Sequence, residues 1–239
     1  MTTTATREQF WVPTPPGWVE IAAFDTDARA ESHWREMLEP ARAHLGERTD
    51  ALLTGLRAAR EAVAGSGVTS AGVVVTSVDD EPAVWTFSTT IEQVTSGEVN
   101  PVALVERSLG HAGTVEATED ITLVDGRTAV QAFLTLTPQT RLGRAHGATS
   151  SAAEEPAGPD RPPVERLGSC VVAVALPDRP HDLVVVTGSS PDPDHRPLLA
   201  HVVSAIAAGV HVGTSAPEGV ARAGAVLPVT DLPAEDDAR

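Results

Sequence analysis

Lysine and tyrosine are both absent from this sequence of 239 residues, and all 17 basic residues are arginine. Without lysine, the chain cannot form a phosphate-binding loop of the G-x-x-x-x-G-K-[ST] type, a Schiff base or the lysine–glutamate pair of a kinase site. Without tyrosine, it has no phenolic general acid. A GC-rich genome, which favours arginine, alanine, glycine, proline and valine codons, is the simplest origin of this composition, and the exclusions hold whatever the origin.

Cysteine is almost absent too, because Cys170 is the one example in the chain. A single thiol allows no internal disulfide and no zinc site built from several thiolates. Cys170 lies in a run of valine and alanine that is typical of a buried strand. We therefore interpret it as a small buried hydrophobic residue and not as a nucleophile.

Long apolar runs and positive charge are also scarce. The longest runs, such as Val171–Leu176 and Leu183–Val186, are far shorter than the roughly 20 residues of a membrane-spanning helix. Residues 1–20 lack a basic start followed by an apolar stretch, so we expect a cytoplasmic protein without membrane insertion. With 33 acidic against 17 basic residues, the formal net charge is −16, which disfavours binding to nucleic acid or anionic membranes.

Aromatic residues are few, yet five of the eight lie within the first 34 residues: Phe10, Trp11, Trp18, Phe24 and Trp34. Residues 1–8 are polar and rich in threonine, which predicts a disordered end. Two short apolar stretches then flank Pro15-Pro16-Gly17, a pattern that predicts either an opening hairpin or a β-corner. The aromatic side chains could hold this unit to the core, or they could form a binding face.

Residues 27–64 show helical periodicity in two successive apolar stripes, with an interruption expected at Pro40 and Gly46. The first stripe comprises Trp34, Met37, Leu38, Ala41 and Leu45, and the second comprises Leu52, Leu53, Leu56, Ala59 and Val63. A short helix is predicted over 101–109. A final helix is predicted over 195–209, with Leu198, Leu199, Val202, Ile206 and Ala207 on its apolar face.

Three consecutive strand pairs are predicted over residues 71–89, 114–137 and 166–189. Each has a turn sequence at its centre, and Asp125-Gly126 is the strongest of these hairpin signals. Strands joined by tight turns pair antiparallel, and the helices must then cover the sheet. The sequence therefore predicts an α+β fold with an antiparallel sheet of about six to seven strands flanked by helices.

The chain is predicted to form a single domain over 9–210, interrupted by a disordered loop at 143–163. This loop consists of small, polar and charged residues without an apolar pattern. Residues 211–239 are rich in glycine, alanine and proline and end in Glu235-Asp236-Asp237, so we interpret them as an acidic flexible tail.

A family resemblance is carried by three stretches: Phe10-Trp11-Val12-Pro13, then Pro16-Gly17-Trp18, and the closing strand Asp182–Ser189 followed by Leu198–Ala208. Together with the order of elements, they resemble the Mog1/PsbP-like fold and, within it, the actinobacterial LpqN-type proteins, over residues 9–210. LpqN-type proteins are typically exported lipoproteins, whereas this chain has no cysteine near its start. Members of this fold mostly bind other proteins, so the resemblance implies an accessory, adaptor or chaperone-like role and transfers no catalytic residues.

The densest cluster of potential metal ligands is Asp192-Pro193-Asp194-His195. Two carboxylates and an imidazole could bind a divalent metal, which would support a small-molecule-binding or metal-dependent hydrolytic enzyme. The alternative, which we prefer, is that Ser190 or Asp192 caps the final helix. No catalytic residue, metal site or cofactor is predicted.

The preferred hypothesis is a non-enzymatic protein that binds another protein, through a face containing Trp11, Trp34, Met37 and Leu38. Tryptophan is enriched in interface hot spots, and a helix with apolar residues at i, i+3 and i+4 is a common docking element. Trp11 and Trp34 each neighbour polar sequence, which favours their exposure. A structural subunit of a larger assembly, formed through residues 27–64, is the remaining alternative.

Overall fold

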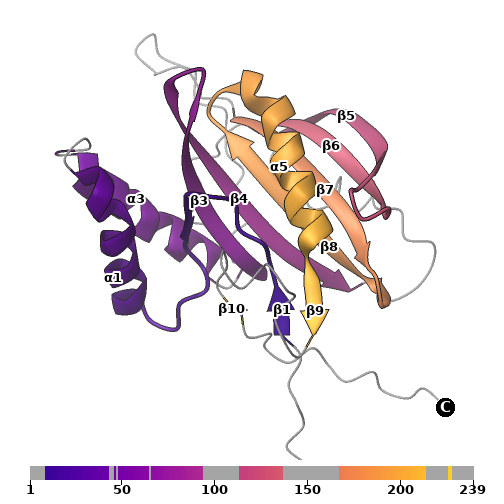
Figure 1. The fold of residues 1–239 in the computed structure, drawn as a ribbon, viewed down its shortest axis with the longest axis horizontal. Helices are drawn as coiled ribbons and strands as arrows, with labels where there is room; N and C mark the ends of the chain where they lie inside the picture. Colours follow the sequence, from indigo (N-terminus) through magenta and orange to yellow (C-terminus); the bar gives the residue numbers. More distant parts are fainter. Residues whose placement is uncertain are drawn as a thin grey trace, which may run out of the picture.

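An antiparallel sheet of seven strands forms the centre of the fold (Figure 1). In a computed structural model, which describes residues 9–42, 46, 48–64, 66–93, 113–136, 167–213 and 226–227, the strand order is β2-β3-β4-β8-β7-β6-β5. The predicted α+β class and the three antiparallel pairs are confirmed. These pairs are β3 (Val68–Val78) with β4 (Glu81–Gln93), β5 (Gly113–Thr122) with β6 (Thr128–Leu136), and β7 (Leu167–Leu176) with β8 (Arg179–Ser190).

The turns explain why these pairs form. Asp79 and Asp80 join β3 to β4 with φ angles of 51° and 67°, the left-handed conformation that matches the twist of a two-residue hairpin. Aspartate tolerates this conformation better than most residues. Gly126 has a φ of 86° between β5 and β6, as the Asp125-Gly126 signal predicts.

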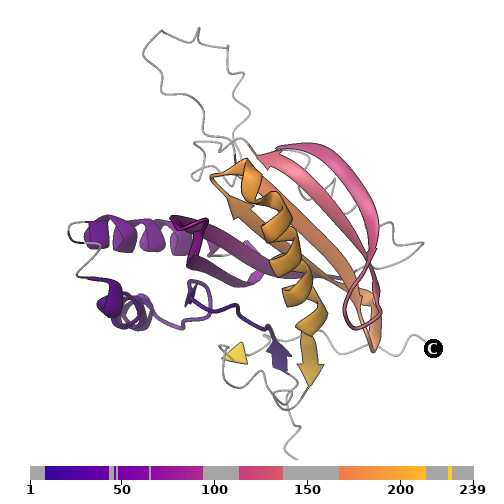
Figure 2. The same ribbon diagram turned by 45° about the horizontal axis from the view of Figure 1, so that its top comes forward.

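One face of the sheet is covered by α5 (Arg196–Gly209), which lies along β7 and β8 (Figure 2). Its buried side consists of Leu199, Val203, Ile206 and Ala207. The predicted face is therefore shifted, because Leu198 is 46% exposed and Val203 is fully buried. Gly188 on β8 permits this close packing, since a Cβ atom there would lie 2.6 Å from Cγ2 of Val203.

The other face is covered at the β2 (Trp18–Glu20) end by α1 (Asp27–Leu38) and α3 (Arg48–Val63). Trp18 packs in the core beneath α5, whereas the next residue, Val19, packs with the two helices, because successive strand residues point to opposite faces. The predicted interruption is confirmed: Pro40 lies in a 3₁₀ turn, η1 (Glu39–Ala41), and Gly46 has a φ of 53°.

A separate three-stranded sheet contains β1 (Gln9–Trp11), flanked by β9 (His211–Gly213) and β10 (Val226–Leu227). Since β1 and β2 belong to different sheets, the hairpin alternative for the N-terminal unit is wrong and the chain turns a corner there.

Two strands of this sheet come from the chain after residue 210, and the predicted domain boundary there stays a prediction. β9 and β10 fall within the predicted flexible tail, yet both pair with β1 and supply the partners that its backbone requires. The predicted disordered segments 1–8 and 143–163, and the predicted helix 101–109, lie outside the described residues. No helix among the described residues is both long and apolar enough to cross a membrane.

The hairpin of β5 and β6 contacts both ends of α5. At the N-terminal end, Arg196 donates a hydrogen bond to Glu116 of β5. At the C-terminal end, Arg127 donates to the carbonyl oxygens of Ala207 and Ala208, at 3.0 and 2.9 Å, and to that of Ala175 on β7 at 3.0 Å. These last carbonyls of the helix have no intrahelical partner, so Arg127 caps the helix and ties it to the sheet.

Arg127→Ala should lower the free energy of unfolding by about 2–3 kcal/mol, because partly buried carbonyl groups lose charge-assisted hydrogen bonds. Arg127→Lys should recover little, since one ammonium group cannot reach carbonyls on both elements. Urea denaturation measures both changes. As a control, Arg29→Ala removes an arginine that is 72% exposed and should cost no more than about 1 kcal/mol. Equal effects of Arg127→Ala and Arg29→Ala would contradict the capping role.

Candidate binding groove

A buried carboxylate, Glu20, organises the turn that connects β2 to α1. Its side chain accepts hydrogen bonds from the backbone amides of Ala22 and Ala23, at 2.9 and 3.0 Å, and from the Trp18 indole at 2.9 Å. Ser70 lies 3.5 Å away on β3. Glu20 is only 3% exposed, so these donors take the place of water around its charge.

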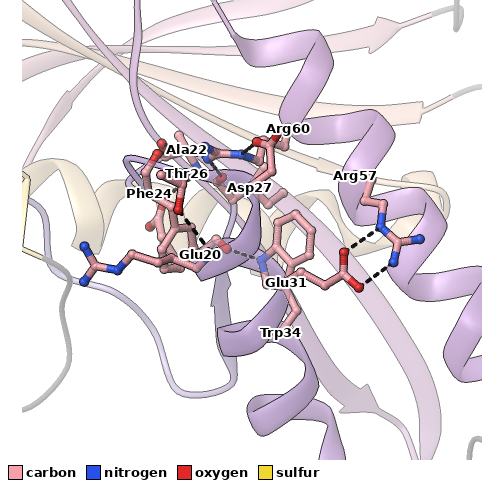
Figure 3. Close-up of polar contacts among 11 residues, drawn as sticks. Glu20, Ala22, Phe24, Thr26, Asp27, Glu31, Trp34, Arg57 and Arg60 are labelled. Carbon is pink, nitrogen blue, oxygen red and sulfur yellow. Dashed lines mark hydrogen bonds and ion pairs between the residues drawn. The ribbon is translucent and has the colours of Figure 1, made fainter.

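The carbonyl groups of the same turn are bound by Arg60 of α3. Its guanidinium group donates to the carbonyl oxygens of Ile21, Ala22 and Phe24, at 2.9, 3.4 and 2.7 Å, and to Asp27 Oδ1 at 2.8 Å. Figure 3 shows Arg60 reaching from α3 toward this turn. The Arg60 side chain is 16% exposed, so this clamp is largely shielded from solvent and fixes α3 relative to the start of α1.

Trp34 completes the connection from the middle of α1. Its indole Nε1 donates a hydrogen bond of 2.6 Å to the backbone oxygen of Glu20, and the side chain is 1% exposed. The turn after β2 therefore has its amides bound by Glu20 and its carbonyls bound by side chains from both helices.

A groove of about 700 Å³ opens between α1, α3 and this turn. Its lining, among the residues that the structure describes, is mixed. Apolar side chains form part of the wall and charged groups form the rest: Ala22, Phe24, Trp34, Val63, Ala64 and Val68, with Asp27, Glu31, Arg57, Arg60 and Glu61. This volume lies within the range of about 300–1,000 Å³ found for ligand pockets.

Ion pairs between the helices hold the groove's shape on its α1 side. Arg57 of α3 binds both carboxylate oxygens of Glu31 on α1, at 3.2 and 2.8 Å (Figure 3). Arg35 donates to the same carboxylate. The hydrogen bond from Arg57, followed by that from Arg35, lowers the pKa of Glu31 from its ordinary value of 4.5 to about 2. Glu31 is therefore charged at neutral pH.

The four predicted binding residues differ in their exposure to solvent. Met37 is 42% exposed, as a docking residue requires, whereas Trp11, Trp34 and Leu38 are 8%, 1% and 5% exposed. The expectation that Trp11 and Trp34 are exposed is wrong, because polar neighbours in a sequence do not determine which side of a helix or strand a residue occupies. The alternative holds: these aromatic side chains anchor the N-terminal region to the core.

The Asp192–His195 cluster acts mainly as a helix start. Asp192 caps the 3₁₀ turn η2 (Pro193–His195) by accepting from the Asp194 amide at 2.9 Å. The predicted cap of the final helix itself is not formed, because α5 begins after His195 without a side-chain hydrogen bond. His195 Nδ1 accepts from Trp85 Nε1 at 3.2 Å and lies 3.1 Å from Ser190 Oγ. Ser190 is 1% exposed, so its hydroxyl offers a substrate no access. No group of three or more metal-ligating side chains is found within the described residues.

Cys170 is fully buried on β7. Burial raises the pKa of its thiol to about 12, so it is protonated at neutral pH and inert as a nucleophile. The interpretation of Cys170 as a small buried hydrophobic residue is confirmed.

Comparison with known proteins gives a weak resemblance of fold. No protein-family model matches the chain, and no curated protein matches its sequence significantly. Among solved structures, LpqN of Mycobacterium tuberculosis, described as involved in cell envelope biogenesis, is 10% identical, with a TM-score of 0.38, over 88% of this chain and 87% of that one. This agrees with the LpqN part of the predicted resemblance at the level of a weak fold likeness. Membership of the Mog1/PsbP-like fold stays a prediction.

The carboxyl group of Glu31 should titrate near pH 2 in a ¹³C NMR experiment. Its pKa should rise toward 4.5 in Arg57→Ala, and by less in Arg35→Ala, because Arg57 makes the larger contribution. The folded-state pKa is depressed, so the stabilisation by these ion pairs is complete above about pH 4.5 and is lost as the pH falls through about 2. Titration of the wild-type carboxyl near 4.5 would show that the pairs do not persist in solution.

Trp34→Ala should lower the free energy of unfolding by about 3–5 kcal/mol, as expected for a buried aromatic residue. Trp34→Phe keeps most of the ring but removes the donor to the Glu20 carbonyl, and should cost about 1–3 kcal/mol. Met37→Ala, on the same helix, should change stability by about 0.5 kcal/mol or less. Thermal and urea denaturation compare the three variants, and an unchanged stability of Trp34→Ala would show that Trp34 is not a core residue.

Proposed function

We propose that this protein is a non-enzymatic accessory domain that binds another protein, and that it accommodates a segment of that partner in the groove between α1 and α3. The observation that carries the proposal is the groove itself, which combines apolar walls with charged groups at its edge. Binding surfaces for peptides typically have this composition, with apolar pockets that give affinity and polar groups that give orientation.

The rigidity of the groove supports a binding role. Its walls belong to two helices and a turn that are joined by the Arg60 clamp and by the Arg57–Glu31 pair. A site whose side chains are already held in place loses less conformational entropy when a ligand binds. Phe24, which lines the groove, also packs against His33 of α1, with 5.1 Å between the centroids of the two rings.

The chemistry of the lining also favours binding over catalysis. Of the three carboxylates among its described residues, Asp27 and Glu31 are paired with arginine, and the arginine side chains serve as structural donors. The alternative hydrolytic site at Asp192–His195 has a buried hydroxyl and a carboxylate that is used as a cap. No observation in the described residues favours it over the groove.

Filling the groove tests the proposal. Ala64 is an exposed residue directly after α3 that lines the groove, so Ala64→Trp should occlude the groove without disturbing the core. Ala58 is exposed on the same helix outside the groove, which makes Ala58→Trp a matched control. We expect affinity purification from the native cell to recover partners with the wild type and Ala58→Trp, and to lose them, by at least about tenfold, with Ala64→Trp. Retention of every partner by a folded Ala64→Trp variant would show that the groove is not the binding site.

A further inference from the structure

We propose that the partner segment that enters the groove is cationic and amphipathic: its apolar side chains fill the groove and an arginine or lysine side chain binds at the edge formed by Asp27 and Glu61. This inference rests on the proposed function and specifies the chemistry of the partner at the same site. It follows from the shape of the lining and from the charges that remain available there.

The apolar part of the lining lies between the two helices and the turn. Phe24 and Val63 are half-buried, as is Val68 at the start of β3, so each offers part of its surface to an apolar ligand. Trp34 lies beneath them as a fixed floor. Apolar side chains presented at helical spacing, i, i+3 or i+4 and i+7, are the usual way to fill such a groove.

Among the described residues of the lining, the carboxylates outnumber the cations by three to two. Glu61 is exposed, and no hydrogen bond or ion pair to it is found in the described part of the chain. The side chain of Asp27 is 95% exposed, and only its Oδ1 atom is bound by Arg60. A basic side chain at this edge would therefore find two acceptors without displacing an existing interaction.

The two arginine residues of the lining do not offer an equivalent site for an anionic segment. Arg60 directs its donors at three backbone carbonyl groups and Asp27, and its side chain is 16% exposed. Arg57 is more exposed, but its charge is balanced by the two-point contact with Glu31. An anionic ligand would have to compete with these carboxylates.

The net charge of the whole chain also favours a cationic partner. A net charge of −16 attracts basic segments over distances comparable to the screening length of the solution and speeds their association. It also disfavours two other occupants. A second copy of the chain carries the same charge, and residues 228–239 contain four acidic residues against one arginine.

The experiment uses two synthetic 14-residue peptides with leucine at the same helical positions and either arginine or glutamate at the polar positions. Binding to the full chain is measured by calorimetry and mapped by ¹⁵N NMR. We expect the arginine peptide to bind the groove, with an affinity that falls as the salt concentration rises. The glutamate peptide should bind at least about tenfold more weakly than the arginine peptide. Glu61→Arg should lower the affinity for the arginine peptide by about three- to tenfold. Glu36→Arg is the control with the same charge change, on an exposed residue of α1 outside the groove, and should change binding less than about twofold.

The outcomes separate the two proposals. Preferred binding of the glutamate peptide, equal effects of Glu61→Arg and Glu36→Arg, or NMR changes confined to another surface would overturn the cationic inference and leave the proposed function standing. If the NMR signals of the groove residues change when the protein is diluted, the occupant is a second copy of the chain. If they change when residues 228–239 are removed, the occupant is the chain's own end. Either result would also overturn the cationic inference.

If neither peptide binds, the inference is tested on the native partner. A photo-crosslinking residue at position 64 captures the segment in the groove; the absence of lysine rules out side-chain amine crosslinking on this chain. A captured segment with net positive charge supports the inference, and one with net negative charge overturns it. Partners that affinity purification recovers equally with the wild type and with Ala64→Trp would instead overturn the proposed function.

Discussion

The buried carboxylate of Glu20 is the interaction on which the α1–α3 side of the molecule depends. It is 3% exposed and faces no arginine or histidine in the described structure; two backbone amides and an indole satisfy it instead. These donors set the path of the chain immediately after β2, and that path presents its carbonyl groups to Arg60 and Trp34. One side chain thus links the edge of the sheet to both helices, and the groove between the helices takes its shape from the hydrogen bonds that hold this turn.

The two faces of the sheet are stabilised by different physics. Beneath α5, valine and leucine side chains interdigitate, and Gly188 lets the helix approach closely. Such a surface excludes water and leaves little space for a ligand. Beneath α1 and α3, the apolar cluster is smaller and the helices are held by hydrogen bonds and ion pairs at their edges. Edges made in this way keep an opening between the elements, which is why the groove lies on this side.

The sequence predicted those parts of the fold that local chemistry determines. The three strand pairs follow from turn residues such as Asp79-Asp80 and Asp125-Gly126, and the break between α1 and α3 follows from Pro40 and Gly46. The groove was not predictable in this way, because Arg60 lies 39 and 36 residues after Ile21 and Phe24, whose carbonyl groups it binds, and nothing in the local sequence marks them as partners. The exposure of Trp11 and Trp34 was predicted wrongly for the same reason. Burial depends on contacts with distant elements, as the bond between Trp34 and the Glu20 carbonyl shows.

The absence of lysine can be related to the way in which arginine side chains connect the elements of this fold. Arg60 binds three carbonyls and a carboxylate, Arg127 binds carbonyls on a strand and at a helix end, and Arg57 binds both oxygens of one carboxylate. Each arrangement uses the fixed fork of a guanidinium group, which directs several donors at once, whereas an ammonium group acts as a point charge. The use of arginine for every basic residue therefore supplies the side chain that these multi-point junctions require. Among the described residues of the groove, these junctions leave Glu61 and one oxygen of Asp27 as available acceptors.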